Sequence, residues 1–244
     1  MFSVAKFHSR LPFIQKRSAS AIQNYLSRLR GLSPLKSANT ESATINKARI
    51  VWVDCEMTGL EVDQHRLVEI ACIVTEPNLE IVDEIGPICI KHPPEVMENM
   101  SGWCKNTFKE NGLIERIEKE GIPEHDAESK VLEFLKKHVP WNKCPLAGNS
   151  VHMDRQFLAK YMPKVMTYLH YRIIDVSSIK ELVKRWYPEE ELDKIPQKKL
   201  VHLALDDIKE SIEELRYYKE HFFQDPSPAQ VAESEKNGEV ERKL

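Results

Sequence analysis

The segment that most restricts the fold is a compact apolar run, Ala48–Asp54, which leads directly into two acidic side chains, Asp54 and Glu56. Such a run suits a buried central strand. Residues two apart on a strand project from the same face, so both carboxylates should point to one side. Open α/β sheets bind ligands beyond the carboxyl ends of their strands. We therefore expect a functional site here; the alternative is a pair of acids solvated in a loop.

The segments that follow predict a mixed α/β fold. Leu67–Thr75 and Ile81–Ile90 are β-rich and separated by a turn at Glu76–Asn78, so the first three strands should form an antiparallel meander. Helical patterns then alternate with two short strands. Helices are expected at Ala127–Val139, at Asp154–Tyr161, from a cap at Ser177 to Trp186, and at Ala204–Phe223, with strands at Cys144–Gly148 and Arg172–Val176. This order predicts one α/β domain, a roughly five-stranded mixed sheet flanked by helices.

The two ends of the chain differ from this domain in composition. Residues 1–40 contain seven Lys or Arg residues and no acid, which is typical of a mitochondrial transit peptide over residues 1–45; a disordered basic arm is the alternative. The folded domain is expected at 46–224. Residues 225–244 are rich in Pro, Glu and Lys and are predicted to be a disordered charged tail. The leader favours the mitochondrial matrix, and the sequence leaves an additional pool in the cytosol or nucleus open.

Charge and hydropathy limit the partners of the domain. Beyond residue 40 the chain has 28 basic and 38 acidic residues. An acidic body argues against tight binding of long nucleic acid, which needs many Lys or Arg contacts to phosphate. No apolar run approaches the ~18–20 residues of a membrane span, so no membrane partner is expected. The five cysteines show no zinc spacing and are predicted to be buried, reduced thiols.

Two later segments contribute further acids. Asp154 follows a Gly-Asn-Ser loop in the first turn of a predicted helix, where capping is the alternative role. His202 and Asp207 are five residues apart, about 140° around one regular helix, and would not share a face. If both act at one site, His202 must lie in the loop before a helix that starts near Ala204. A surface loop position without function is the alternative for His202.

These acids predict a metal site. Four converging carboxylates (Asp54, Glu56, Asp154 and Asp207) cannot remain ionised together unless cations lie among them. Oxygen-only ligands favour two Mg²⁺ or Mn²⁺ ions, the usual machinery for cutting phosphodiesters. His202 would accept the proton of the attacking water as general base. The residues therefore predict a metal-dependent nuclease.

At this point the chain resembles a known family. D-C-E-M-T-G-L, R-L-V-E-I-A, G-N-S-V-H-M-D-R-Q-F-L, Y-R-I-I-D-V-S-S-I-K-E-L and H-L-A-L-D-D-I-K-E-S-I-E-E-L-R-Y-Y are similar to the exonuclease motifs of the DEDD superfamily, in its histidine-containing branch, and most of all to oligoribonucleases. The resemblance spans about residues 48–223. It implies a ribonuclease H-like exonuclease fold, 3′-to-5′ action with two metals, and a substrate of short single-stranded RNA, especially dinucleotides.

The resemblance also implies roles for individual side chains. Leu60 would wedge against a base and Trp103 would line the base pocket, unless both are core residues. Ser150, Arg172 and Ser177 would contact the terminal phosphate, with a surface strand position as the alternative for Arg172. These residue types suit a phosphate and a base. Tyr171 would reach the active site of the other subunit, because the family is homodimeric.

One segment departs from the family, and two other functions stay open. After Trp103 and Cys104, where relatives often carry histidines, this chain has Lys-Asn-Thr-Phe, and we expect Phe108 to replace a ring that packs against the substrate. A proofreading type of DNA 3′-5′ exonuclease would use the same carboxylates. A non-catalytic RNA-binding module is disfavoured because all five catalytic positions are occupied.

Overall fold

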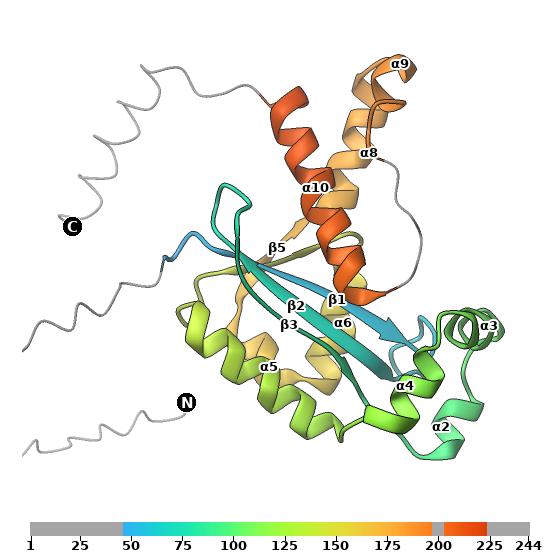
Figure 1. Ribbon diagram of the computed structural model, residues 1–244. Coiled ribbons are helices and arrows are strands. Elements are labelled where there is room, and N and C mark those ends of the chain that lie inside the picture. Colours follow the sequence, from blue (N-terminus) through green and yellow to red (C-terminus); the bar gives the residue numbers. More distant parts are fainter. Residues whose placement is uncertain (1–45, 197–202, 224–244) are drawn as a thin grey trace, which may run out of the picture. The chain divides into compact units, whose positions relative to one another are not determined.

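A computed structural model describes residues 46–196 and 203–223 (Figure 1). The predicted transit peptide or basic arm, the charged tail from residue 225 and the proposed base His202 lie outside the described residues. Within them, five strands form one sheet in the order β3–β2–β1–β4–β5. The strands are β1 (Ile50–Met57), β2 (Leu67–Thr75), β3 (Ile81–Cys89), β4 (Pro145–Gly148) and β5 (His170–Asp175).

The central strand β1 is antiparallel to β2 and parallel to β4. β2 and β3 complete the predicted antiparallel meander, and β4 and β5 are parallel, so the predicted mixed five-stranded sheet is confirmed. The carboxyl ends of the three parallel strands β1, β4 and β5 consequently lie at the same end of the sheet. Trp52 is the last residue of β1 that pairs with β4, whereas β1 itself continues to Met57. Asp54 and Glu56 lie on this extension.

Helices cover both faces of the sheet (Figure 1). They are α2 (Pro94–Glu98), α3 (Gly102–Glu110), α4 (Leu113–Glu120), α5 (Glu124–His138), α6 (His152–Tyr161), α7 (Pro163–Tyr168), α8 (Val176–Trp186), α9 (Glu189–Leu192) and α10 (Ala204–Phe222). On β1, Val51 and Val53 pack with α5, α6 and α7, whereas Trp52 packs with α8 and α10. This alternation follows from the two-residue period of a strand.

A third, smaller apolar cluster lies under α3 and α4. It joins Phe108 and Leu113 of these helices to Val68 on β2. The cluster holds α3 against the end of the sheet that carries Glu56 and Glu69. The pattern after Pro94 predicts helices but not this packing, which brings Trp103 next to the end of β1.

Most predicted elements are confirmed within a few residues, but one predicted cap is wrong. Ser177 does not cap the eighth helix, because α8 already begins at Val176 and its N-cap is Asp175, whose side chain accepts a hydrogen bond from the Ser177 backbone N–H. The predicted strand end at Val176 therefore belongs to the helix. All five cysteines are buried and none forms a disulfide, as predicted. Among the described residues, none of the helices has the length and apolar character to cross a membrane.

Candidate active site

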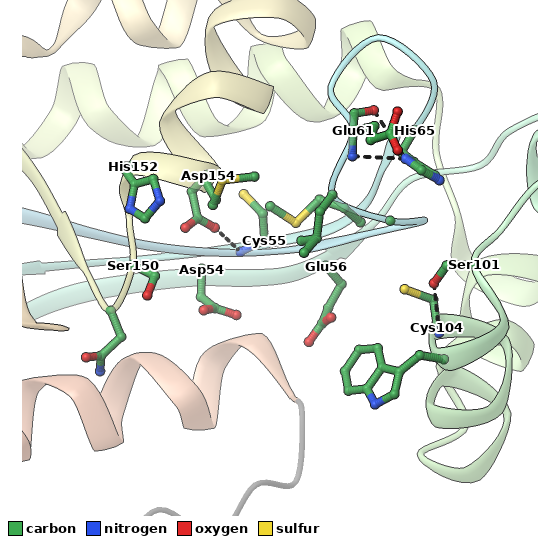
Figure 2. A pocket seen from close by; sticks show the side chains of 16 residues that line it. Asp54, Cys55, Glu56, Glu61, His65, Ser101, Cys104, Ser150, His152 and Asp154 are labelled. Atoms are coloured by element: carbon green, nitrogen blue, oxygen red, sulfur yellow. Dashed lines mark hydrogen bonds between the residues drawn. The ribbon is translucent and has the colours of Figure 1, made fainter.

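Three carboxylates from two distant segments meet at the end of β1. One oxygen from each of Asp54, Glu56 and Asp207 lies within 4.8 Å of the others. Figure 2 shows Asp54 and Glu56 pointing to the same side of β1, the side on which α10 lies. Asp207 lies in the first turn of α10, which starts at Ala204 as predicted. The cluster forms because the end of β1, which carries Asp54 and Glu56, lies close to the first turn of α10, which carries Asp207.

Asp154 approaches β1 from the other side of the sheet (Figure 2). It is buried in the first turn of α6, and its Oδ1 accepts a hydrogen bond of 2.9 Å from the backbone N–H of Cys55. This N–H is available because β4 has already ended. The N-cap of α6 is Val151, which provides no side-chain cap, and Asp154 lies three residues further along the chain. Asp154 lines the same cleft as Asp54 and Glu56.

Burial and mutual repulsion make this site difficult to ionise without a cation. Burial, followed by the nearby Glu69, Asp207 and Asp154, raises the pKa of Glu56 to about 8. Burial also raises the pKa of Asp154 to about 7, although the Cys55 N–H opposes the shift. A divalent cation would favour the ionised carboxylates. The oxygen-only donor set and its raised pKa values fit a divalent metal ion.

A buried ion pair borders the acids and was not singled out in the sequence. Glu69 on β2 lies directly opposite Glu56 on β1 and is fully buried. Arg116 of α4 contacts its Oε2 at 2.6 Å. The only signal in the sequence was the glutamate of R-L-V-E-I-A; the partner 47 residues later could not be predicted without the packing of α4.

The acids open into a cleft of about 900 Å³. Leu60 and Trp103 line this cleft, and their side chains are 71% and 60% exposed. The alternative that either is a core residue is therefore wrong. His65 and His152 also line the cleft. His152 lies within the motif that contains Asp154, and His65 directly precedes R-L-V-E-I-A, but neither is predicted from the sequence to belong to the site.

Ser150 lines the other end of the cleft, and Ser177 lies beside it. Ser150 follows β4 with a left-handed φ of 51°, and its N–H donates to Asp175 Oδ1 and to Ser177 Oγ, each at 3.0 Å. The hydroxyls of Ser150 and Ser177 are 3.2 Å apart. Ser177 Oγ also donates to Asn149 Oδ1. The structure thus brings together two of the three residues expected to hold a terminal phosphate.

The third residue, Arg172, lies on the edge strand β5 beside Tyr171, and both side chains are exposed. Neither lines the cleft. The Arg172 guanidinium carbon is 5.4 Å from the centre of the Tyr171 ring. Tyr171 is therefore an exposed aromatic side chain on the edge strand of the sheet.

The expectation for Phe108 is wrong. Its side chain has no exposed surface and packs with Val68, Met100 and Leu113 in the cluster beneath α3 and α4. It supports the helix that carries Trp103 and does not face the cleft. On α3, Trp103 and Phe108 are five residues apart, so they project from different faces.

This combination of sheet and acid cluster is that of an exonuclease. Residues 51–215 match the model of the exonuclease family. A mitochondrial oligoribonuclease of Homo sapiens is 45% identical over 194 residues, covering 80% of this chain and 81% of that protein. An oligoribonuclease of Haemophilus influenzae is 49% identical over 180 residues, covering 73% and 97%. The chain therefore belongs to the oligoribonuclease family of exonucleases, which hydrolyse phosphodiester bonds.

Solved structures agree on the fold. An exonuclease I from Methylocaldum szegediense superposes with a TM-score of 0.56 at 17% identity, over 72% of this chain. The matched part is 41% of that protein's length, so this likeness supports the fold alone. The predicted α/β exonuclease fold is confirmed.

Proposed function

We propose that this protein is a 3′-to-5′ exoribonuclease that hydrolyses short oligoribonucleotides, especially dinucleotides, to 5′-mononucleotides. The observation that carries this proposal is one cleft that joins carboxylates to two exposed apolar side chains, Leu60 and Trp103. Apolar and aromatic side chains at an exposed position suit stacking on bases. The relatives named above as oligoribonucleases support the same substrate class.

Asp54, Glu56, Asp154 and Asp207 would hold two Mg²⁺ or Mn²⁺ ions. Their clustering and raised pKa values support this assignment. The bound ions would neutralise the carboxylates and polarise the scissile phosphate. The N–H of Cys55 fixes one oxygen of Asp154, so its other oxygen is directed by the rigid end of β1. His202 would accept the proton of the attacking water, from its position just before α10.

The opposite end of the cleft would recognise the end of a short substrate. Ser150 and Ser177 present adjacent hydroxyls that would donate to a terminal phosphate, the Ser177 hydroxyl by turning away from Asn149 Oδ1, and Arg172 would add a positive charge. A phosphate held there would be the last group that the cleft accommodates. This would favour dinucleotides over longer chains.

We further propose a homodimer in which Tyr171 reaches the active site of the partner. Its exposure on the edge strand β5 supports this arrangement. Residues 1–45 would direct the protein to the mitochondrial matrix, since the relatives in Homo sapiens and Bos taurus are named as mitochondrial. Fusion of residues 1–45 to a fluorescent protein tests this localisation, and a cytosolic or nuclear signal would oppose it.

Turnover of a diribonucleotide tests the proposed activity. We expect hydrolysis with Mg²⁺ or Mn²⁺, none with EDTA, and none after Asp154→Ala. Hydrolysis that survives Asp154→Ala would refute the proposed metal ligands. Faster hydrolysis of single-stranded DNA than of RNA would favour the proofreading type of exonuclease, and binding without hydrolysis would favour an RNA-binding module.

A further inference from the structure

The loop between β1 and β2, residues 58–66, presents Leu60 to the cleft. It is closed at its base by two hydrogen bonds: Thr58 N–H donates to Arg66 O at 2.9 Å, and Arg66 N–H donates to Thr58 Oγ1 at 3.0 Å. The Leu60 side chain itself is largely exposed. An exposed side chain on a loop needs contacts to the neighbouring backbone to hold one position.

His65 provides contacts to both neighbours of Leu60. The Glu61 N–H donates to His65 Nδ1 at 3.1 Å. On the other side, the imidazole ring lies so close to Gly59 that a Cβ built at Gly59 would be 2.4 Å from His65 Nε2. Figure 2 shows His65 beside Glu61 at the rim of the cleft. The ring therefore fixes the backbone before and after Leu60.

The part of the loop that carries His65 is attached to α6. The Tyr161 hydroxyl lies 2.7 Å from Val62 O and 2.9 Å from His65 O, and Arg66 Nη1 donates to it at 2.6 Å. Because α6 also carries Asp154, the loop and the acid site share one rigid support. The His65 side chain connects this support to both neighbours of Leu60, in addition to the backbone bonds from Gln64 N–H and His65 N–H to Glu61 O.

We propose that His65 is a positioning residue that holds Leu60 ready to contact a base of the substrate. This rests on the proposed function, in which Leu60 contacts a base. A side chain fixed before binding loses less conformational entropy when the ligand arrives, so affinity is higher. His65 then acts on substrate binding through Leu60, and it has no part in the hydrolysis itself.

The test measures binding and turnover of a diribonucleotide for matched variants of the full chain. Binding is measured with Ca²⁺ in place of Mg²⁺, and KM and kcat are measured with Mg²⁺. We expect His65→Ala to weaken binding and raise KM by about tenfold, with kcat and Tm little changed. His65→Asn retains an acceptor for the Glu61 N–H and should restore part of the affinity. His125→Ala, at an exposed histidine on α5, is the control and should have no effect.

A double-mutant cycle separates action through Leu60 from direct contact. Leu60→Ala should weaken binding, and adding His65→Ala should then have no further effect. Additive losses, or unchanged binding in His65→Ala, would overturn the proposal. Leu60→Ala with wild-type affinity would also overturn it, by removing the contact on which it rests. If the wild-type protein neither bound nor cleaved the diribonucleotide, the proposed function would fail instead.

Discussion

Glu56 and Glu69 lie directly opposite each other on β1 and β2, and both are buried. Two buried carboxylates at neighbouring positions repel each other unless positive charge is near. Arg116 supplies that charge to Glu69 from α4. The acid cluster at the end of β1 therefore lies next to a second carboxylate that already has a permanent cation.

Arg116→Met should destabilise the fold, because it leaves Glu69 buried and without its cation. We expect a loss of about 3 kcal/mol in the free energy of unfolding, the lower end of the range for a broken buried ion pair, since Arg116 is partly exposed. Urea unfolding measures this loss. Adding Glu69→Gln should recover part of it, and an Arg116→Met protein as stable as the wild type would contradict this account.

The raised pKa values of Glu56 and Asp154 predict how stability depends on pH. Their pKa values are about 8 and about 7 in the folded protein, whereas unfolded carboxyls titrate near pH ~4. Between these values the folded state holds protons that the unfolded state has released, so stability falls as the pH rises. In EDTA, the free energy of unfolding should decrease from about pH 5 to about pH 8.

Two comparisons isolate this effect. In a variant with Glu56→Gln and Asp154→Asn, the free energy of unfolding should decrease much less with rising pH, since neither amide titrates. Excess Mg²⁺ should also reduce this pH-dependent loss of stability in the wild type, because the ion binds the ionised carboxylates of the folded state. A wild type in EDTA that gained stability relative to this variant as the pH rose would disprove the raised pKa values.

Two adjacent aspartates on α10 allow a matched test of the acid cluster. Asp207 belongs to the cluster, whereas the neighbouring Asp206 is exposed. Loss of an outer partner of a metal site typically costs about 10–100-fold in affinity or activity. Asp207→Asn, which removes a ligand, should therefore reduce kcat/KM by more than about 100-fold. Asp206→Asn should remain within about twofold, and equal losses would argue against the cluster as the site.

Mixed dimers test whether Tyr171 acts in the partner's site. Tyr171→Ala and Asp154→Asn should each be weakly active as homodimers. A heterodimer of the two has one site with intact acids and an intact tyrosine from the other chain. Mixing the two variants after dissociation should therefore restore up to about a quarter of the wild-type activity, if chains pair at random. No recovery in verified heterodimers would place Tyr171 in its own subunit's site or outside the site.

The sequence predicted the strands better than the contacts between distant segments. Val51–Val53 and the alternation along β1 specify a buried strand by local pattern alone. The burial of Phe108 and the ion pair of Arg116 depend on how α3 and α4 pack against the sheet. The pattern predicts a strand that runs to Val176 and therefore a cap at Ser177, whereas Asp175 both ends β5 and caps α8. The local sequence pattern does not specify contacts between distant segments or the exact residue at which a strand gives way to a helix.

The candidate site shows the same limit. The two-residue spacing of Asp54 and Glu56 correctly predicts a shared direction, and the helix start near Ala204 correctly places Asp207 in a first turn. The hydrogen bond from Cys55 N–H to Asp154 could not be predicted, because it depends on where β4 ends relative to β1. His65 was missed for a similar reason, since its contact with Gly59 is formed by the shape of the loop.

The most direct test of the proposed function is a series of RNA substrates from two to about 20 nucleotides, each measured with Mg²⁺ and with EDTA. Ser150 at the end of the cleft, with Ser177 beside it, should limit the length of the substrate by holding its terminal phosphate. The quantity to compare is kcat/KM at each length. We expect the highest value for the dinucleotide, a steep decrease with length, and no hydrolysis in EDTA. Hydrolysis of 20-mers as fast as of dinucleotides, or turnover that EDTA does not affect, would contradict the account.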